Sequence, residues 1–149
     1  MKDAPVLICY DGSAEAERAI DAASELLGHR RAVVLDVGPL VTPTESLAVM
    51  GPVPAAAFEE VNEDDAEQRA RAGVEKARRA GFDAEARAEV AAPTWQEIVD
   101  VADEIDAAVI VLGSRGLHGA RETFEGSVSH DVAAHAGRPV LIVPPPRGA

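Results

Sequence analysis

Residues 6–20 read VLICYDGSAEAERAI, which is an apolar run, a turn of Asp11, Gly12 and Ser13, and a segment with helical spacing. Three more apolar runs lie at residues 32–37, 107–112 and 139–143. Short runs rich in Val, Ile and Leu, without polar alternation, are typical of parallel strands covered on both faces. The four runs therefore predict four strands of a parallel sheet.

Segments with helical periodicity separate these runs. Apolar residues recur at helical spacing over 16–27 and 95–105, which predicts two amphipathic helices. The second has Thr94 and, three residues later, Glu97, the pattern of a capping box directly after Pro93. Residues 55–80 predict a long helix that ends at Gly81, because glycine readily adopts the left-handed conformation found at many helix ends.

Residues 82–90 alternate apolar and charged side chains, which predicts a strand at a sheet edge, where charge discourages pairing with other chains. The complete order alternates strands and helices. It predicts a single α/β domain over residues 1–149, an open five-stranded parallel sheet with helices on both faces. Residues 38–54 form a long Pro- and Gly-containing loop, and loops of this length are functional or flexible.

Composition narrows the function classes. The chain has 149 residues and a formal net charge of −12, which disfavours nucleic acids and acidic membranes as partners. No apolar stretch reaches the ~20 residues that span a bilayer, and the first residues do not resemble a secretion signal, so we expect a cytoplasmic protein. The single cysteine, Cys9, lies inside an apolar run and is expected to be buried and inert.

A glycine-rich loop follows the predicted strand 107–112. It begins GSRGLHG at Gly113 and runs to Gly126 and Ser127, where the last helix is predicted to start. Glycines let backbone amides approach an anion, and a helix N-terminus adds free amides and a positive dipole end. The alternative is that these glycines only make turns and Ser127 only caps a helix.

Common nucleotide and phosphate signatures are missing from the sequence. It contains neither G-x-G-x-x-G after the first strand nor G-x-x-x-x-G-K-[ST] anywhere. A phosphoacceptor receiver domain would carry an acidic pair after strand one, an Asp after strand three and a Lys after strand five. The chain has one Asp, then Val90-Ala91-Ala92, then Pro144 at these places.

The spacing Gly113-x₂-Gly116-x₉-Gly126-Ser127 matches the G-x₂-G-x₉-G-[ST] signature of the ATP-binding branch of the universal stress protein family. The resemblance covers essentially the whole chain. It implies an adenine nucleotide alpha hydrolase-like sheet with strand order 3-2-1-4-5, and ATP as the ligand, with Mg²⁺ or Mn²⁺ held mainly by the phosphates.

The resemblance also implies a set of binding residues. Asp11 would accept hydrogen bonds from the ribose hydroxyls or the base edge, Val37 would offer its backbone to adenine, and Cys9 and Leu112 would line the pocket. A side chain at Gly113 would block the approach of the phosphates. The implied set is Cys9, Asp11, Val37, Leu112, Gly113, Arg115, Gly116, Gly126, Ser127, Val128 and Ser129. For Asp11 a turn-capping role, for Cys9 and Leu112 a core role, and for Arg115 a solvated surface position remain alternatives.

In that strand order, residues 139–143 form an edge strand without a charge. An exposed apolar edge favours aggregation, so a second copy paired through this strand would form a homodimer. Three functional hypotheses stay open. The first is an ATP-binding regulatory protein of the stress response, whose nucleotide orders loops for an unidentified protein partner. The others are a slow ATPase, although no catalytic residues are evident, and an interaction module that binds no nucleotide.

Overall fold

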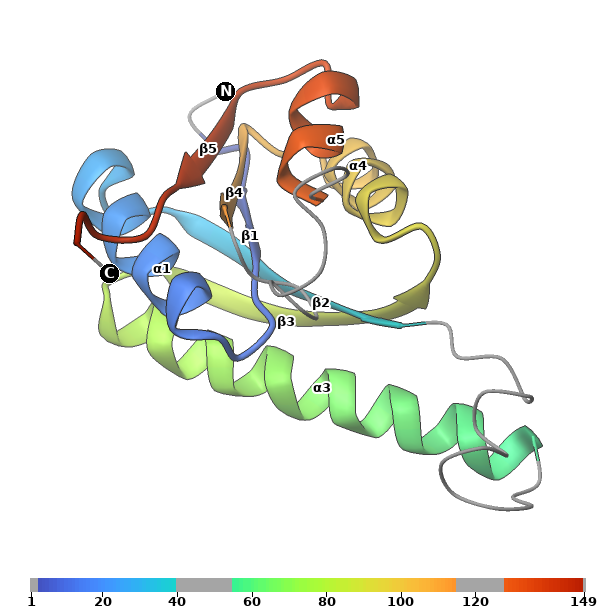
Figure 1. Ribbon diagram of the computed structural model, residues 1–149. Helices are drawn as coiled ribbons and strands as arrows, with labels where there is room; N and C mark the ends of the chain where they lie inside the picture. The colour runs from blue at the N-terminus through green and yellow to red at the C-terminus, as the bar shows by residue number, and fades with distance from the viewer. Residues whose placement is uncertain (1–2, 40–54, 115–127, 149) are drawn as a thin grey trace.

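The computed structural model describes residues 3–39, 55–114 and 128–148, which form one parallel sheet between two layers of helices (Figure 1). In chain order the elements are β1 (Val6–Cys9), α1 (Ala14–Leu27), β2 (Arg31–Pro39), α3 (Ala55–Arg79), β3 (Asp83–Ala91), α4 (Thr94–Glu104), β4 (Val109–Gly113), α5 (Val128–His135) and β5 (Val140–Val143). The strand order is β3-β2-β1-β4-β5 and every neighbouring pair is parallel. The predicted α/β fold and strand order are confirmed.

Two hydrophobic cores lie on opposite faces of the sheet. Helices α1 and α3 cover one face, where Ile20 and Val74 pack on the inward side chains of β1 and β2. Helices α4 and α5 cover the other face, where Ile98 and Val132 pack on the alternate strand residues. All four residues of β1 are buried, because this central strand has a neighbour on each side and a helical layer on each face. This double coverage explains why the apolar runs lack polar alternation.

The two edges of the sheet differ in character. β3 forms one edge and carries the charged residues Asp83, Glu85, Arg87 and Glu89, as its period-two pattern predicts. β5 forms the other edge and reads VLIV, with three half-buried residues followed by the buried Val143. Individual strands begin or end one or two residues away from the predicted runs.

One predicted helix end is confirmed, and one predicted helix cap is wrong. Helix α3 ends at Arg79, and Gly81 follows with φ of +108°, where the amide of Phe82 donates to the carbonyl of Ala77 at 3.0 Å. The capping box at Thr94 is not formed. Pro93 occupies the N-cap position of α4 and has no side-chain cap, while its carbonyl accepts from the amide of Gln96 at 3.2 Å. Thr94 is therefore already inside the helix, so its hydroxyl cannot act as the N-cap.

Candidate functional site

The carboxyl ends of the neighbouring strands β2, β1 and β4 lie side by side at the same end of the sheet. The chain continues from β1 to β2 on one side of β1, and returns later to β4 on its other side. This reversal of direction is the topological switch point, where open α/β sheets form their ligand crevices. The turn of Asp11 to Ser13 after β1 and the end of β4 at Gly113 both lie at this point.

Asp11 lies in a tight turn between β1 and α1. Its Oδ1 atom accepts a hydrogen bond from the amide of Ser13 at 2.9 Å, and Gly12 has φ of +82°, a conformation that favours glycine. The hydroxyl of Ser13 then accepts from the amide of Ala16 at 3.1 Å and caps α1. The turn thus holds the Asp11 carboxylate at the carboxyl end of β1, where it is half-buried.

Val37 lies beyond the last paired residue of β1. The β1–β2 register ends with Cys9 opposite Leu35, whereas β2 continues to Pro39 and pairs Val37 with Glu89 of β3. The Val37 side chain is buried in the core beneath α4 and α5. The backbone of β2 at Val37 therefore projects past the end of β1, at the switch point.

Cys9 and Leu112 belong to the hydrophobic core. Their exposed fractions are 3% and 1%, and both side chains pack in the cluster beneath α4 and α5. Burial raises the pKa of the Cys9 thiol to about 12, with a smaller contribution from the negative charge of Asp11. The thiol is therefore neutral at physiological pH, as the sequence predicted for a buried, inert cysteine.

Gly113, the last residue of β4, lies directly against the first turn of α1. A Cβ atom added there would lie 3.2 Å from both the Cβ and the backbone oxygen of Glu15. The absence of a side chain therefore lets α1 approach β4, whether or not a ligand binds. The expectation that a side chain at Gly113 would only block phosphates needs correction, because a larger residue would also displace α1.

The remaining residues of the predicted phosphate loop lie only partly within the described chain. Residues 115–127 are outside it, and they contain Arg115, Gly116, Gly126 and Ser127. Val128 and Ser129 form the first turn of α5; Ser129 is buried, and Val128 packs against the core cluster that also holds Cys9 and Leu112. The N-terminus of α5 is thus anchored to the same core that supports the carboxyl ends of β1 and β4.

An ion pair near the carboxyl end of β2 was not predicted from the sequence. Asp36 of β2 is completely buried, and its carboxylate accepts from Arg69 of α3 in a bidentate pair, with distances of 2.7 Å to Nε and 3.1 Å to Nη2. The hydrogen bond to Asp36 is the largest cause that raises the pKa of Arg69. The one signal in the sequence is the single acid inside the apolar run 32–37.

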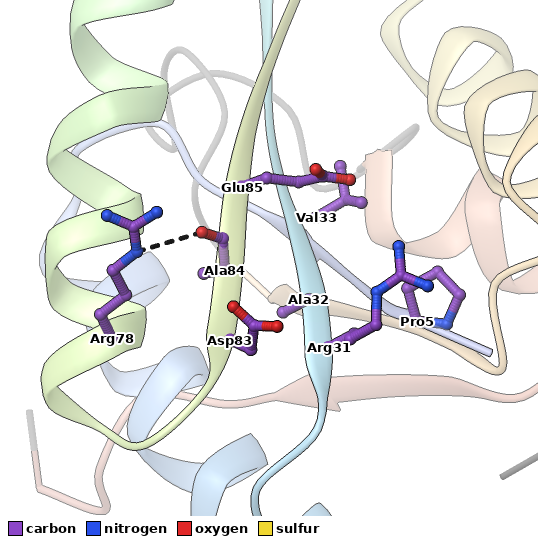
Figure 2. A pocket seen from close by; sticks show the side chains of 8 residues that line it. All are labelled: Pro5, Arg31, Ala32, Val33, Arg78, Asp83, Ala84 and Glu85. Carbon is purple, nitrogen blue, oxygen red and sulfur yellow. Dashed lines mark hydrogen bonds between the residues drawn. The ribbon is translucent and has the colours of Figure 1, made fainter. Parts of the chain in front are cut away.

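Other features of the described chain do not point to a competing site. A pocket of about 200 Å³ lies at the amino ends of β2 and β3, and Figure 2 shows Arg78 and Glu85 on opposite sides of its strands. Within residues 3–39, 55–114 and 128–148, no cluster of His, Cys, Asp or Glu could hold a metal ion. No helix in this part of the chain combines the length and the apolar character needed to cross a membrane.

The strand order defines a doubly wound α/β protein whose topological switch point lies at the carboxyl ends of β1, β2 and β4. The family model described as "Universal stress protein family" matches residues 4–144. The chain belongs to this family.

Relatives of known sequence or structure agree with this assignment. Universal stress protein YxiE of Bacillus subtilis is 35% identical over 144 residues, which cover 93% of this chain and 97% of that protein. The universal stress protein from Archaeoglobus fulgidus in complex with dAMP is 27% identical, with a TM-score of 0.62, and the match covers 96% of this chain and 99% of that one. A universal stress protein in complex with cAMP is 25% identical, with a TM-score of 0.63, and covers 96% and 98% of the two chains.

Proposed function

We propose that this protein binds ATP at the carboxyl ends of β1, β2 and β4, as a regulatory member of its family. The observation that carries the proposal is the convergence of Asp11, Val37 and Gly113 at the topological switch point. Two similar proteins of the family hold dAMP and cAMP, which supports an adenine nucleotide as the ligand class. The motif Gly113-x₂-Gly116-x₉-Gly126-Ser127 supports a longer phosphate chain, since it supplies backbone amides and a hydroxyl.

Each part of the site has a separate role in this proposal. The Asp11 carboxylate accepts from the ribose hydroxyls, and the projecting backbone of β2 at Val37 faces the adenine edge. The glycine-rich loop, from Gly113 to Ser127, and the first turn of α5 surround the phosphates. Cys9 and Leu112 contribute indirectly, because their side chains belong to the hydrophobic core that underlies the proposed site. A divalent cation would be held by the phosphates.

The bound nucleotide would act by ordering the segments around it, of which residues 40–54 and 115–126 lie outside the described chain, while Gly38 and Pro39 belong to β2 and Gly113 to β4. A ligand can only shift a conformational equilibrium when it binds one state better than another. We therefore expect the ATP-bound form to present a surface for a protein partner that the free form does not present. The slow ATPase remains the second candidate, and phosphate release per bound ATP, with and without Mg²⁺, distinguishes the two.

The direct test is titration of the purified protein with ATP by calorimetry, together with Asp11→Asn. Asparagine keeps an oxygen for the Ser13 amide, so the turn stays intact while the charge is lost. Loss of one charge-assisted hydrogen bond should weaken ATP binding by about tenfold or more. Ser127→Ala should weaken ATP more than adenosine, since it removes a proposed phosphate contact.

The matched control is Asp83→Asn, which removes the same charge from an exposed position at the amino end of β3. This variant should bind ATP as the unaltered protein does. The proposal is refuted if the unaltered protein binds no adenine nucleotide at millimolar concentration. The non-binding interaction module would then become the better hypothesis.

A further inference from the structure

One arginine on α3 lies close to two parts of the proposed nucleotide site. Arg69 holds the carboxylate of Asp36 through two hydrogen bonds, and Asp36 directly precedes Val37 on β2. The same arginine also lies near the turn after β1, because a Cβ atom added to Gly12 would lie 3.9 Å from its Cδ atom. The Arg69 side chain thus reaches from α3 to β2 and to the neighbourhood of the turn.

The electrostatic surroundings of Arg69 include the proposed ribose ligand. After the hydrogen bond to Asp36, the negative charges of Asp36, Asp65 and Asp11 also raise the pKa of its guanidinium, against the opposing effect of burial. Asp11 is therefore close enough to be attracted by the guanidinium. Its own turn fixes one carboxylate oxygen through the amide of Ser13 at 2.9 Å.

Stability alone does not require an ion pair at this position. Asp36 shares its sheet face with Ala32 and Val34, which pack in the apolar cluster beneath α1 and α3. Apolar residues of similar volume often replace a buried ion pair without loss of stability. The Asp36 carboxylate is fully buried and therefore costly to desolvate, while 31% of the Arg69 side chain remains exposed. Because this carboxylate lies beside the candidate site, we ask whether the pair has a role that apolar packing would not fill.

Resting on the proposed nucleotide binding, we propose that Arg69 is a positioning residue for ribose recognition. Anchored by Asp36, its guanidinium attracts Asp11, and its stem lies near the Gly12 turn. The Asp11 carboxylate is thereby held in the orientation that accepts hydrogen bonds from ribose hydroxyls. Arg69 would then strengthen binding of ribonucleotides more than binding of 2′-deoxyribonucleotides, which lack one of those hydroxyls.

The test compares ATP with 2′-deoxy-ATP in variants that separate positioning from stability. Arg69→Met alone removes the guanidinium that pairs with the buried Asp36 carboxylate and should lower the unfolding midpoint. The double variant Asp36→Val with Arg69→Met should recover the midpoint. The proposal expects its ATP affinity to stay about tenfold weaker while 2′-deoxy-ATP affinity changes less than about threefold, so the ratio of the two affinities falls.

Two further variants complete the comparison. Arg71→Met makes the same substitution at an exposed position of the same helix, and should leave both affinities unchanged. Arg69→Lys keeps the charge but loses the bidentate geometry, so it should give an intermediate ratio even if the double variant fails to fold. Adding Asp11→Asn to the double variant should lower the ratio little further, because both changes act on the same carboxylate.

The outcomes separate this inference from the proposed function. If the unaltered protein binds neither nucleotide, both proposals fail. If it binds ATP, and the stable double variant or Arg69→Lys keeps the original ratio of ATP to 2′-deoxy-ATP affinity, the positioning role is wrong. The proposed nucleotide site would stand in that case, and the ion pair would be a structural link between α3 and β2 only.

Discussion

Cys9 and Asp36 show two ways of burying an ionisable side chain in the same sheet. The Cys9 thiol is neutral, because burial and, to a smaller extent, the negative charge of Asp11 raise its pKa to about 12. Asp36 is fully buried with its carboxylate bound to a guanidinium. The neutral thiol of Cys9 needs no partner charge in the core. The ion pair of Asp36, in contrast, fixes the position of a charge beside the proposed site.

The state of Cys9 leads to a prediction for thiol chemistry. A buried thiol with so high a pKa should not react with an aromatic disulfide reagent in the native protein at pH 8. The reagent should react with one thiol per chain after unfolding in guanidinium chloride. The measurement is the labelling rate as a function of denaturant. Rapid, stoichiometric labelling without denaturant would contradict the burial of Cys9.

For individual residues, the sequence predicted the surroundings of Cys9 but not the partner of Asp36. The environment of Cys9 was predictable because its four neighbours in the run are apolar or aromatic. The partner of Asp36 was not, since Arg69 is 33 residues away and α3 carries several other arginines that point to solvent or to other groups. Deciding which arginine faces inward requires the rotation of α3 on the sheet, which no local pattern specifies.

At the scale of elements, the close packing of α3 on the sheet depends on a glycine, Gly73. Gly73 is buried in the middle of this helix, and a Cβ atom added there would lie 2.7 Å from Tyr10 Cδ1 and from Val34 Cγ1. Real Cβ atoms essentially never approach other atoms so closely. The glycine therefore sets how near the helix can lie to the sheet, although glycine is unfavourable inside helices.

Gly73→Ala tests this packing against intrinsic helix propensity. Propensity alone would stabilise the protein by about 1 kcal/mol, while overpacking costs about 1–3 kcal/mol. We expect a net loss of stability in urea unfolding. Ala72→Gly, at the neighbouring exposed position, is the control, and should destabilise by about 1 kcal/mol through propensity alone. A Gly73→Ala protein that is more stable than the unaltered one would contradict the close contact.

Elements were predicted better than their ends. Double coverage of the sheet produces continuous apolar strands, and helical spacing is long enough to recognise, so the order of elements followed from periodicity. The helix α4 begins at Thr94 as predicted, but its cap was predicted wrongly, because Pro93 takes the N-cap position that the Thr94 and Glu97 pattern suggested for threonine. The contact of Gly113 with Glu15 was also missed, since it joins β4 to a helix almost a hundred residues earlier.

For the whole molecule, the distribution of charge fits a site for a small anion. Residues 113–149 hold three acids and four bases, so the excess of acids lies in residues 1–112. Such a surface repels polyanions, but it does not prevent backbone amides from binding one phosphate chain. The overall charge disfavours nucleic acids from the sequence alone, whereas the proposed place of a small anion depends on the switch point of the fold.

The uncharged edge of the sheet supports the proposed homodimer. β5 is the last strand in the order, and the carbonyls of Pro139 and Val143 accept hydrogen bonds from the amides of Ile110 in β4 and Ser114 directly after it. Because backbone groups alternate in direction along a parallel strand, those of Val140 and Ile142 point toward the open edge. An uncharged edge strand of this kind is a template for pairing, and a twofold copy of β5 would satisfy it.

Ile142→Pro tests whether strand pairing joins two copies. The unaltered protein should sediment at micromolar concentration with twice the 15.6 kDa of one chain. Proline removes the outward amide without touching the amides that face β4, so the variant should keep its circular dichroism and sediment as a monomer. Ile142→Ala loses more of the side chain but keeps the amide, and should remain dimeric. A monomeric unaltered protein, or a dimeric proline variant, would show that β5 does not join the copies.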